Sequence, residues 1–352
     1  MIEPIVCVPA RNEAERLPCL LQALQEQTWL RAHKRLLRTV LVLNNCDDNS
    51  RAVVQRVAQR LPRVSLHVIE AEFSPENAHV GSARRLAMDR AFALAPNNSV
   101  LLSTDADAIP RHDWVEANLC AIASGADVVG GHIVGNKQEE ASLGPRFVRR
   151  AARHLYYAKL VDRLTSLVDP LPHDPWPRHS DHTGASLAVR SEVYAAVGGM
   201  PVLPFREDVA FVERVCRAGY RLRHPLDVQV TVSARLDGRA AGGMSDCLKT
   251  WLAAEEGGVP HLVEDPQGMI FRMRHRQSHG LAPRAIRLPA GEEIVQPPKV
   301  HAFASITTVP ARADTSIEVE LAISQLERMI AYNEGKVDVT GSSTLDFLQG
   351  AD

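Results

Sequence analysis

The chain lacks any long apolar run: no stretch approaches the roughly 18 uninterrupted apolar residues that a membrane-spanning helix needs. Its beginning also lacks the apolar segment of a secretory signal peptide. No excess of charge of one sign is present, since the formal net charge is −2 over 352 residues. This balance argues against a nucleic-acid-binding surface. We therefore expect a cytoplasmic globular protein without a transmembrane segment, and the composition leaves peripheral contact with a membrane open.

The cysteines also show no recognisable spacing pattern. The six cysteines are scattered, without a CxxC pair or another metal-ligand spacing. Several lie within apolar runs, which favours reduced, buried thiols over a disulfide framework. The chain shows no internal repeat, and its length allows one large core or two modest ones.

Strand-like apolar runs alternate with helix-like segments through the first 135 residues. This alternation predicts an α/β fold with a mostly parallel sheet and helices on both faces. The strands are expected at residues 4–9, 39–43, 64–69, 100–102 and 128–134, and the helices at 13–27, 49–60, 78–94 and 113–123. Further on, strands are expected at residues 185–189 and 228–232, and helices at 142–168, 191–197, 207–218 and through Trp251.

The character of the chain changes beyond about residue 280, where prolines are frequent and periodicity is weak, apart from one helix expected at 316–332. We expect two halves of one domain, residues 1–135 and 136–260. We expect residues 281–352 to form a C-terminal appendage that packs on the core or mediates self-association, as in a homodimer.

Residues 101–108 (LLSTDADA) are the most informative stretch, because an apolar run stops there at two aspartates. Such a run predicts a buried strand that delivers Asp105 and Asp107 to the carboxyl edge of the sheet, where open α/β sheets bind ligands. Two adjacent carboxylates favour Mg²⁺ or Mn²⁺, which prefer oxygen ligands and substrate phosphates. A lone DxD is weak evidence, but this one ends a strand and is followed by Pro110 and a helix start at Asp113. We therefore predict a metal–diphosphate site.

Six segments, in order between residues 4 and 245, resemble glycosyltransferase family 2. They are residues 8–13 (VPARNE), 44–50 (NNCDDNS), 81–84 (GSAR), 104–107 (TDAD), 184–186 (GAS) and 206–208 (RED). Each alone is weak, whereas together and in order they are specific. The resemblance implies a GT-A fold, a nucleoside-diphosphate sugar donor such as a UDP- or GDP-sugar, a divalent cation, and inverting transfer. It assigns residues 1–135 to the nucleotide sugar and residues 136–260 to the acceptor and catalysis.

Candidate donor contacts follow the first two strands. Pro9, Arg11 and Glu13 lie in a turn whose backbone N–H groups and arginine suit a nucleotide, with an ordinary helix N-terminus as the alternative. The family pattern has an aspartate for uracil N3–H where this chain has Asn44, and an amide both accepts and donates, so the base stays open. Arg84 is either a phosphate or base contact or a solvated helix arginine.

Asp208 is the candidate general base. A position near a helix N-terminus favours its ionised form, which suits a group that takes a proton from an acceptor hydroxyl. The metal on Asp107 would neutralise the leaving diphosphate in the same step. The alternative is an acidic helix cap without chemistry. Arg235 and Arg239, followed by Gly242–Gly243, are expected to close over the diphosphate, with surface charge as the alternative.

The histidine-rich loop at residues 169–182 (DPLPHDPWPRHSDH) invites a zinc site, but it offers no complete tetrahedral set at structural spacing. We expect instead a polar loop on the acceptor side. The acceptor-side candidates are Trp176, which would stack on a sugar, His182, Gly184 and Glu207. His224 is a further candidate ligand to the metal.

Three hypotheses remain open. The first is a single-transfer glycosyltransferase acting on an unidentified hydroxyl acceptor, since the chain lacks transmembrane segments and a Q-x-x-R-W motif near Trp251. The second is a nucleotidyltransferase, although residues 9–13 lack the glycines such enzymes use to cradle a triphosphate. The third is a non-catalytic sugar-nucleotide-binding or scaffolding protein on the same fold.

Overall fold

The computed structural model describes residues 2–96, 98–239, 242–278 and 316–335. Its centre is a seven-stranded sheet in the order β3-β2-β1-β4-β8-β6-β9. The parallel strands are β1 (Glu3–Ala10), β2 (Leu37–Asn44), β3 (Val64–Ala71) and β4 (Ser99–Ser103). β8 (Leu187–Arg190) runs antiparallel to β4 and to β6 (Val128–Gly130), and β9 (Leu222–Arg223) pairs parallel with β6. The predicted mostly parallel sheet is confirmed.

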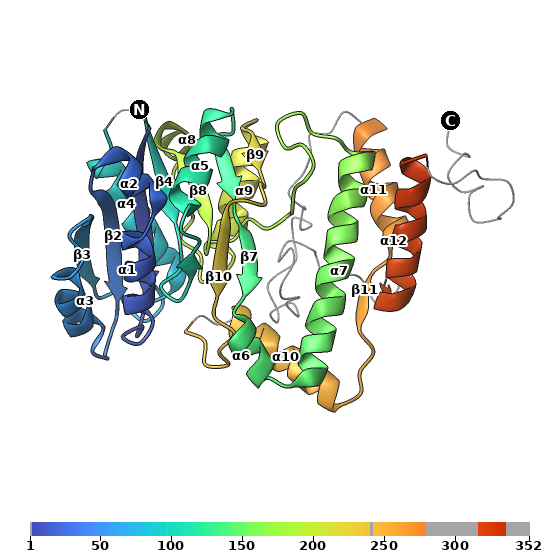
Figure 1. Cartoon of the computed structure of the whole chain (residues 1–352), viewed down its shortest axis with the longest axis horizontal. Coiled ribbons are helices and arrows are strands. Elements are labelled where there is room, and N and C mark those ends of the chain that lie inside the picture. Colours follow the sequence, from blue (N-terminus) through green and yellow to red (C-terminus); the bar gives the residue numbers. More distant parts are fainter. Residues whose placement is uncertain (1, 97, 240–241, 279–315, 336–352) are drawn as a thin grey trace, which may run out of the picture.

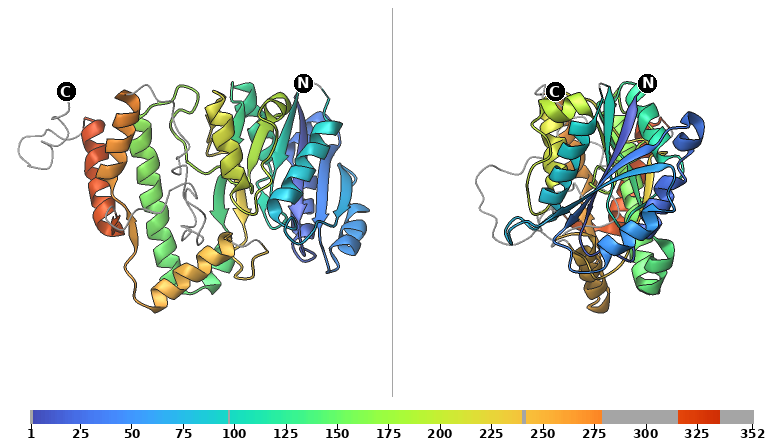
Figure 2. Two further views of the ribbon diagram at one scale, coloured as in Figure 1. Left: turned by 180° about the vertical axis from the view of Figure 1, so that it is seen from behind. Right: turned by 90° about the vertical axis from the view of Figure 1, so that its left-hand side faces the viewer.

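Helices cover both faces of this sheet (Figure 2). Along β1, Val6 and Val8 join one apolar cluster while Ile5 and Cys7 join the other, because successive strand residues point to opposite faces. Both faces of β1 are therefore buried, as a continuous apolar run predicts. The first cluster includes α1 (Leu17–Gln25), α2 (Thr28–His33), α3 (Ser50–Ala58) and α5 (Trp114–Ala123). The second includes α4 (Val80–Leu94), α8 (Ser191–Ala196) and α9 (Glu207–Arg217).

The single strand expected at residues 128–134 is two strands. β6 ends at Gly130, and β7 (His132–Gly135) belongs to a second sheet of order β5-β10-β7, with β5 (Ile109–Pro110) and β10 (Gln229–Val232). Gly131 lies at the break, where a Cβ would come within 1.9 Å of the Ser186 hydroxyl. The chain therefore changes sheets at a residue that tolerates no side chain.

A helical layer stands beside the sheets (Figure 1). Apolar side chains of its helices form a separate core that includes Leu164, Met269, Ile323 and Leu326. The layer consists of α6 (Lys137–Ser142), α7 (Pro145–Val168), α10 (Met244–Glu256), α11 (Pro266–Ser278) and α12 (Val319–Asn333), with β11 (Leu262–Glu264) paired to β12 (Ser316–Glu318).

The described part of the predicted appendage is β12 and α12. The helix expected at 316–332 begins three residues late because residues 316–318 pair with β11. α12 packs on α7 rather than on the sheet, with ion pairs from Arg153 to Glu320 and from Arg163 to Glu334. Residues 281–315 and 336–352 of the appendage lie outside the described residues.

All six cysteines are free. Cys7 and Cys247 are buried, whereas Cys19 and Cys120 are exposed, so burial holds for only some of the thiols. Within the described ranges, none of the helices combines the length and the apolar composition needed to cross a membrane.

Candidate active site

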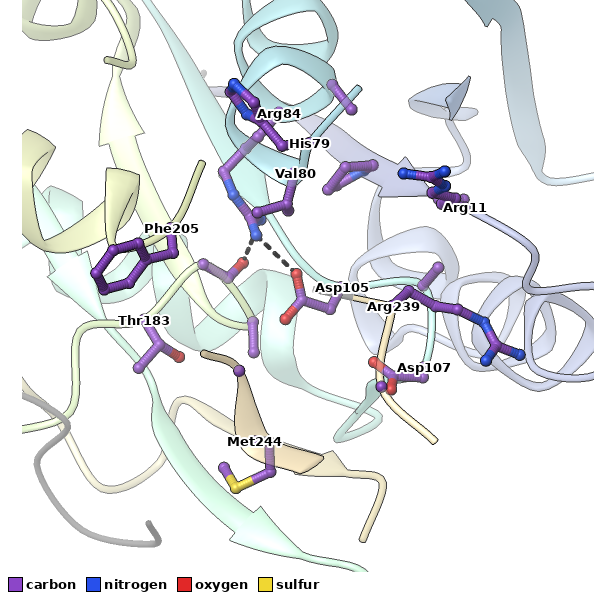
Figure 3. Close-up of a pocket in the computed structure, with 18 of the residues that line it drawn as sticks. Arg11, His79, Val80, Arg84, Asp105, Asp107, Thr183, Phe205, Arg239 and Met244 are labelled. Atoms are coloured by element: carbon purple, nitrogen blue, oxygen red, sulfur yellow. Dashed lines mark hydrogen bonds and ion pairs between the residues drawn. The ribbon is translucent and has the colours of Figure 1, made fainter. Parts of the chain in front are cut away.

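A cavity of about 270 Å³ lies at the carboxyl ends of β1, β2 and β4 (Figure 3). Residues far apart in the sequence meet there because the carboxyl ends of parallel strands share one edge of the sheet. The sequence-predicted residues in its lining are Pro9, Arg11, Glu13, Asn44, Arg84, Asp105, Asp107, Gly184, Glu207, Asp208, Arg235 and Arg239.

The turn that carries the two aspartates is held on both sides. The backbone N–H of Thr104 donates to the Cys7 carbonyl of β1 at 3.1 Å. The Thr104 hydroxyl donates to the Ala185 carbonyl at 2.9 Å. Because β4 ends at Ser103, these two bonds place Asp105 and Asp107 just beyond the strand, next to the glycine turn at 184–186.

Arg84 on α4 is a buried cation at the centre of the site, with a side chain only 4% exposed. Its guanidinium donates to Asp105 Oδ1 (2.8 Å), Glu207 Oε1 (2.8 Å), Ser103 Oγ (2.8 Å) and the Gly184 carbonyl (2.9 Å). Burial alone lowers the pKa of Arg84, but Asp105 and Glu207 outweigh it and raise the pKa. Arg84 is thus not a solvated helix arginine: it joins Asp105, the glycine turn and α9.

Gly184 leaves no room for a side chain, since a Cβ there would lie 2.3 Å from Cζ of Arg84. We expect Gly184→Ala to displace the guanidinium and to lower the free energy of unfolding by about 1–3 kcal/mol, as overpacking does. Urea denaturation measures this. Gly268→Ala is the matched control, because its nearest neighbour lies 3.6 Å away at the end of the Arg272 side chain. Equal unfolding free energies for the two variants would contradict the prediction.

A second arginine joins the turn after β1 to the aspartate pair. Arg235 forms a two-pronged ion pair with the buried Glu13, one contact being 2.8 Å, and its Nη2 lies 3.0 Å from Asp107 Oδ2. Burial raises the pKa of Asp107 to about 6, and the nearby Asp105 adds to this while Arg235 opposes it. Arg239 is exposed, with Nε 3.4 Å from the Asn12 carbonyl.

Asp105 and Asp107 fit a divalent cation. Both supply the hard oxygen ligands that Mg²⁺ and Mn²⁺ prefer, and burial, with the neighbouring Asp105 and Glu13 carboxylates, raises the pKa of Asp107 despite Arg235. A bound diphosphate would add further negative charge. The charged lining comprises five carboxylates, Glu13, Asp105, Asp107, Glu207 and Asp208, and five arginines, Arg11, Arg84, Arg206, Arg235 and Arg239.

Asp208 lies in the first turn of α9 and is held by two backbone donors. Oδ2 accepts the N–H of Gly184 at 2.6 Å, and Oδ1 accepts the N–H of Val209 at 2.7 Å. Arg206 precedes the helix in a left-handed conformation with φ of 57°, which turns the chain into α9. The carboxylate is therefore positioned by the helix start and by the glycine turn together.

Asn44 ends β2 and is 2% exposed. Its Nδ2 donates to the His79 carbonyl at 3.3 Å, while its buried Oδ1 has no hydrogen-bond partner among the described residues. The cavity lining also contains neighbours that were not predicted, among them His79, Val80, Thr183, Phe205 and Met244. The first four lie next to the GSAR, GAS and RED segments, and Met244 follows Gly242–Gly243, which is the only sequence signal for them.

Three predicted site residues are absent from the cavity lining: Trp176, His182 and His224. Trp176 is 43% exposed and the Arg163 guanidinium lies 4.9 Å from its ring. Nδ1 of His224 lies 2.9 Å from Asp174 Oδ2, and Nε2 of His224 lies 3.3 Å from His182 Nδ1. These contacts hold His224 in another cluster, so we do not carry it forward as a ligand beside Asp107.

That cluster, called the histidine cluster below, consists of His132, His179, His182, His224, Asp174 and Asp181. Burial lowers the pKa of both His179 and His182 to about 3. His132 was not predicted, because it reaches the loop at 169–186 from β7 and no local spacing connects the two.

Residues 5–171 match the model of glycosyl transferase family 2. S. aureus TarS 1-349 in complex with UDP is 14% identical, covering 72% of this chain and 65% of its own, with a TM-score of 0.45. The mannosyltransferase PcManGT from Pyrobaculum calidifontis, in complex with GDP-Man and Mn²⁺, is 18% identical. The match covers 98% of this chain and 78% of the PcManGT chain, with a TM-score of 0.47. Glucosyl-3-phosphoglycerate synthase from Mycobacterium tuberculosis, in complex with phosphoglyceric acid, is 14% identical. The match covers 73% of this chain and 80% of the synthase chain, with a TM-score of 0.40.

No significant match is found among curated proteins. The chain spans 65% of the length of the TarS chain. The matched segment contains β1 to β4, the aspartate pair and Arg84, and the sheet has the α/β arrangement expected of a GT-A fold. The match to glycosyl transferase family 2 thus covers residues 5–171, just under half of the chain, and includes these strands and charged residues.

Proposed function

We propose that this protein is a metal-dependent, inverting glycosyltransferase that moves one sugar from a nucleoside-diphosphate sugar to a hydroxyl acceptor. The observation that carries the proposal is the convergence of Asp105, Asp107 and Asp208 on one cavity. Arg84 and Gly184 join Asp105 to Asp208, and Arg235 contacts Asp107. The match of residues 5–171 to glycosyl transferase family 2 supports the reaction class. The same match, and the absence of glycine from residues 9–13, disfavour a nucleotidyltransferase.

For the donor, we propose that Asn44 Oδ1 accepts an N–H of the base, since this buried acceptor has no partner among the described residues. Uracil and guanine both offer a ring N–H, which agrees with a UDP- or GDP-sugar. Arg11, with Nη1 2.7 Å from the Ala78 carbonyl, and the exposed Arg239 flank the space for the diphosphate. Asp105 and Asp107 would hold Mg²⁺ or Mn²⁺, which supplies positive charge for the leaving diphosphate.

For the chemistry, we propose that Asp208 takes the proton of the acceptor hydroxyl. The hydroxyl oxygen forms a bond to the anomeric carbon as the bond from that carbon to the diphosphate oxygen breaks, and the bonding electrons leave with the diphosphate. Arg84 and Arg235 keep Asp105 and Asp107 in place during this step. Attack opposite the leaving group inverts the anomeric configuration.

The experiment that tests the donor site is a thermal-shift screen of UDP, GDP, CDP and dTDP, each with and without Mn²⁺. We expect one diphosphate to raise Tm in a metal-dependent way, since a ligand that binds only the native state stabilises it. A rise independent of metal would remove Asp105 and Asp107 from the proposed role. No response in folded protein would contradict the donor site altogether.

We also expect metal-dependent nucleotide binding to weaken at low pH. Below about pH 6 Asp107 is protonated and cannot ligate a cation, so the metal-dependent part of the affinity should fall about tenfold per pH unit. Isothermal titration of the responding nucleotide with Mn²⁺, between about pH 5 and about pH 7.5, measures it. Asp107→Asn should abolish both the metal effect and its pH dependence. The exposed Asp227→Asn is the control, and a pH-independent wild type would contradict the prediction.

A further inference from the structure

The histidine cluster lies outside the cavity lining, and the proposed transfer reaction uses none of its side chains. Three of its members come from two chain segments: His132 from β7, and His179 and Asp181 from the loop between α7 and β8. His179 and Asp181 are buried, and the His132 side chain is 18% exposed. His132 thus leaves a path by which a small ion can reach the cluster.

Distances among these three residues match those between the ligands of one metal ion. Asp181 Oδ2 lies 3.1 Å from His132 Nδ1 and 3.6 Å from His179 Nδ1. One ligand atom from each residue lies within 4.8 Å of the other two. Ligands of a tetrahedral zinc ion stand roughly 3.3 Å apart at normal bond lengths. His132 and Asp181 already have the spacing of two ligands, whereas His179 approaches the carboxylate through Nδ1, so its ring must adjust locally to bring Nε2 to a shared ion.

A second observation, independent of these distances, points to a missing ligand. Nε2 of His179 is buried and has no hydrogen-bond partner among the described residues, in a residue only 4% exposed. Its other nitrogen, Nδ1, accepts the backbone N–H of Asp181 at 2.9 Å. The rings of His132 and His224 lie next to the His179 ring, with centroid-to-centroid distances of 4.9 Å and 5.6 Å. Buried polar atoms without a partner are rare in native proteins, so this nitrogen calls for an explanation.

We propose that His132, His179 and Asp181 bind a divalent transition-metal ion of the zinc class. Two imidazole nitrogens and a carboxylate oxygen form a zinc ligand set that leaves a fourth position for water. The cation replaces the proton between His132 and Asp181, and His179 offers Nε2. Its ring proton then moves to Nδ1, which breaks the contact with the Asp181 N–H, so the loop adjusts locally when metal binds. The N–H of Ile133, 3.1 Å from Asp181 Oδ2, keeps the carboxylate beside β7.

Such an ion would fasten the loop at 169–186 to β7. Asp181 lies three residues before Gly184, whose carbonyl and N–H contact Arg84 and Asp208. The ion would therefore support the glycine turn from outside the cavity lining. Its existence does not depend on the proposed glycosyl transfer.

The test begins with the full chain stripped of metal by a chelator and titrated with Zn²⁺ or Co²⁺ alone. We expect about one ion per chain, a visible spectrum of tetrahedral Co²⁺, and a Tm several degrees higher with Zn²⁺. His132→Asn and His179→Asn keep a hydrogen-bonding group toward Asp181 but lose the imidazole ligand. We expect Zn²⁺ affinity about tenfold weaker or worse in either variant. His67→Asn, at an exposed position on β3, is the matched control.

Wild-type protein that binds neither ion overturns the proposal, as does a folded His132→Asn variant that binds Zn²⁺ as tightly as wild type. Asp107→Asn distinguishes this site from the aspartate pair: it should keep the zinc while losing Mn²⁺-dependent nucleotide binding. Zinc lost in Asp107→Asn would place the ion in the cavity and overturn the proposal. Failure of the nucleotide screen with retained zinc would contradict the transfer reaction alone.

Discussion

Asp208→Asn is expected to lower kcat by about 10²–10⁴-fold while leaving the Kd for the nucleoside diphosphate unchanged. The amide oxygen can still accept the N–H of Gly184, now 2.6 Å from Oδ2, so the contact with the glycine turn should persist while the N–H of Val209 loses its side-chain acceptor. The amide cannot take the proton of an attacking hydroxyl. Turnover is measured as release of nucleoside diphosphate, with water or a panel of hydroxyl compounds as acceptor, and binding is measured by calorimetry.

Glu213→Gln is the matched control for this variant. Glu213 lies on the same helix, α9, and pairs with Arg217 at the surface, outside the cavity lining. It should keep wild-type turnover. Unchanged turnover in Asp208→Asn would show that another group takes the proton. A wild-type chain that binds the diphosphate sugar but turns over no donor would instead favour the non-catalytic hypothesis.

Arg84→Met is expected to lower the free energy of unfolding by about 3–5 kcal/mol, because removing one partner of a buried ion pair leaves an uncompensated charge. The carboxylate most affected is Glu207, whose side chain is 4% exposed, whereas Asp105 is 35% exposed. The Gly184 carbonyl and the Ser103 hydroxyl also lose a donor. Urea denaturation at constant ionic strength measures the loss, with the exposed Arg90→Met on the same helix as control.

Two further measurements decide whether the loss comes from the buried charge. The double variant Arg84→Met/Glu207→Gln should recover part of the stability, since the amide needs no counter-charge. Burial raises the pKa of Glu207 even with Arg84 present, and that cation opposes the rise. In Arg84→Met the carboxyl should therefore protonate more readily, and the loss should shrink as pH falls. A loss unaffected by pH and by Glu207→Gln would mean that lost packing, not charge, explains it.

The apolar periodicity of the sequence and the positions where strands end were enough to predict the fold and most of the site residues. The apolar run of β1 predicts burial on both faces, and Val6 and Cys7 indeed belong to the two opposite cores. Asp105 and Asp107 follow directly after β4, so a sheet with parallel strands necessarily brings them near the ends of β1 and β2. Burial and the ends of elements are local properties, which a single sequence can encode.

Only the tertiary structure decided the partners of each charge. The GSAR segment singles out Arg84, but nothing local shows that it is buried while Arg90 on α4 is exposed. Nothing local connects Glu13 with Arg235, 222 residues later. The same holds for His132, which meets Asp181 only because the chain leaves the main sheet after Gly130. Side-chain pairs depend on how elements cross and pack, so sequence alone predicted which residues approach the site but not which of them bind each other.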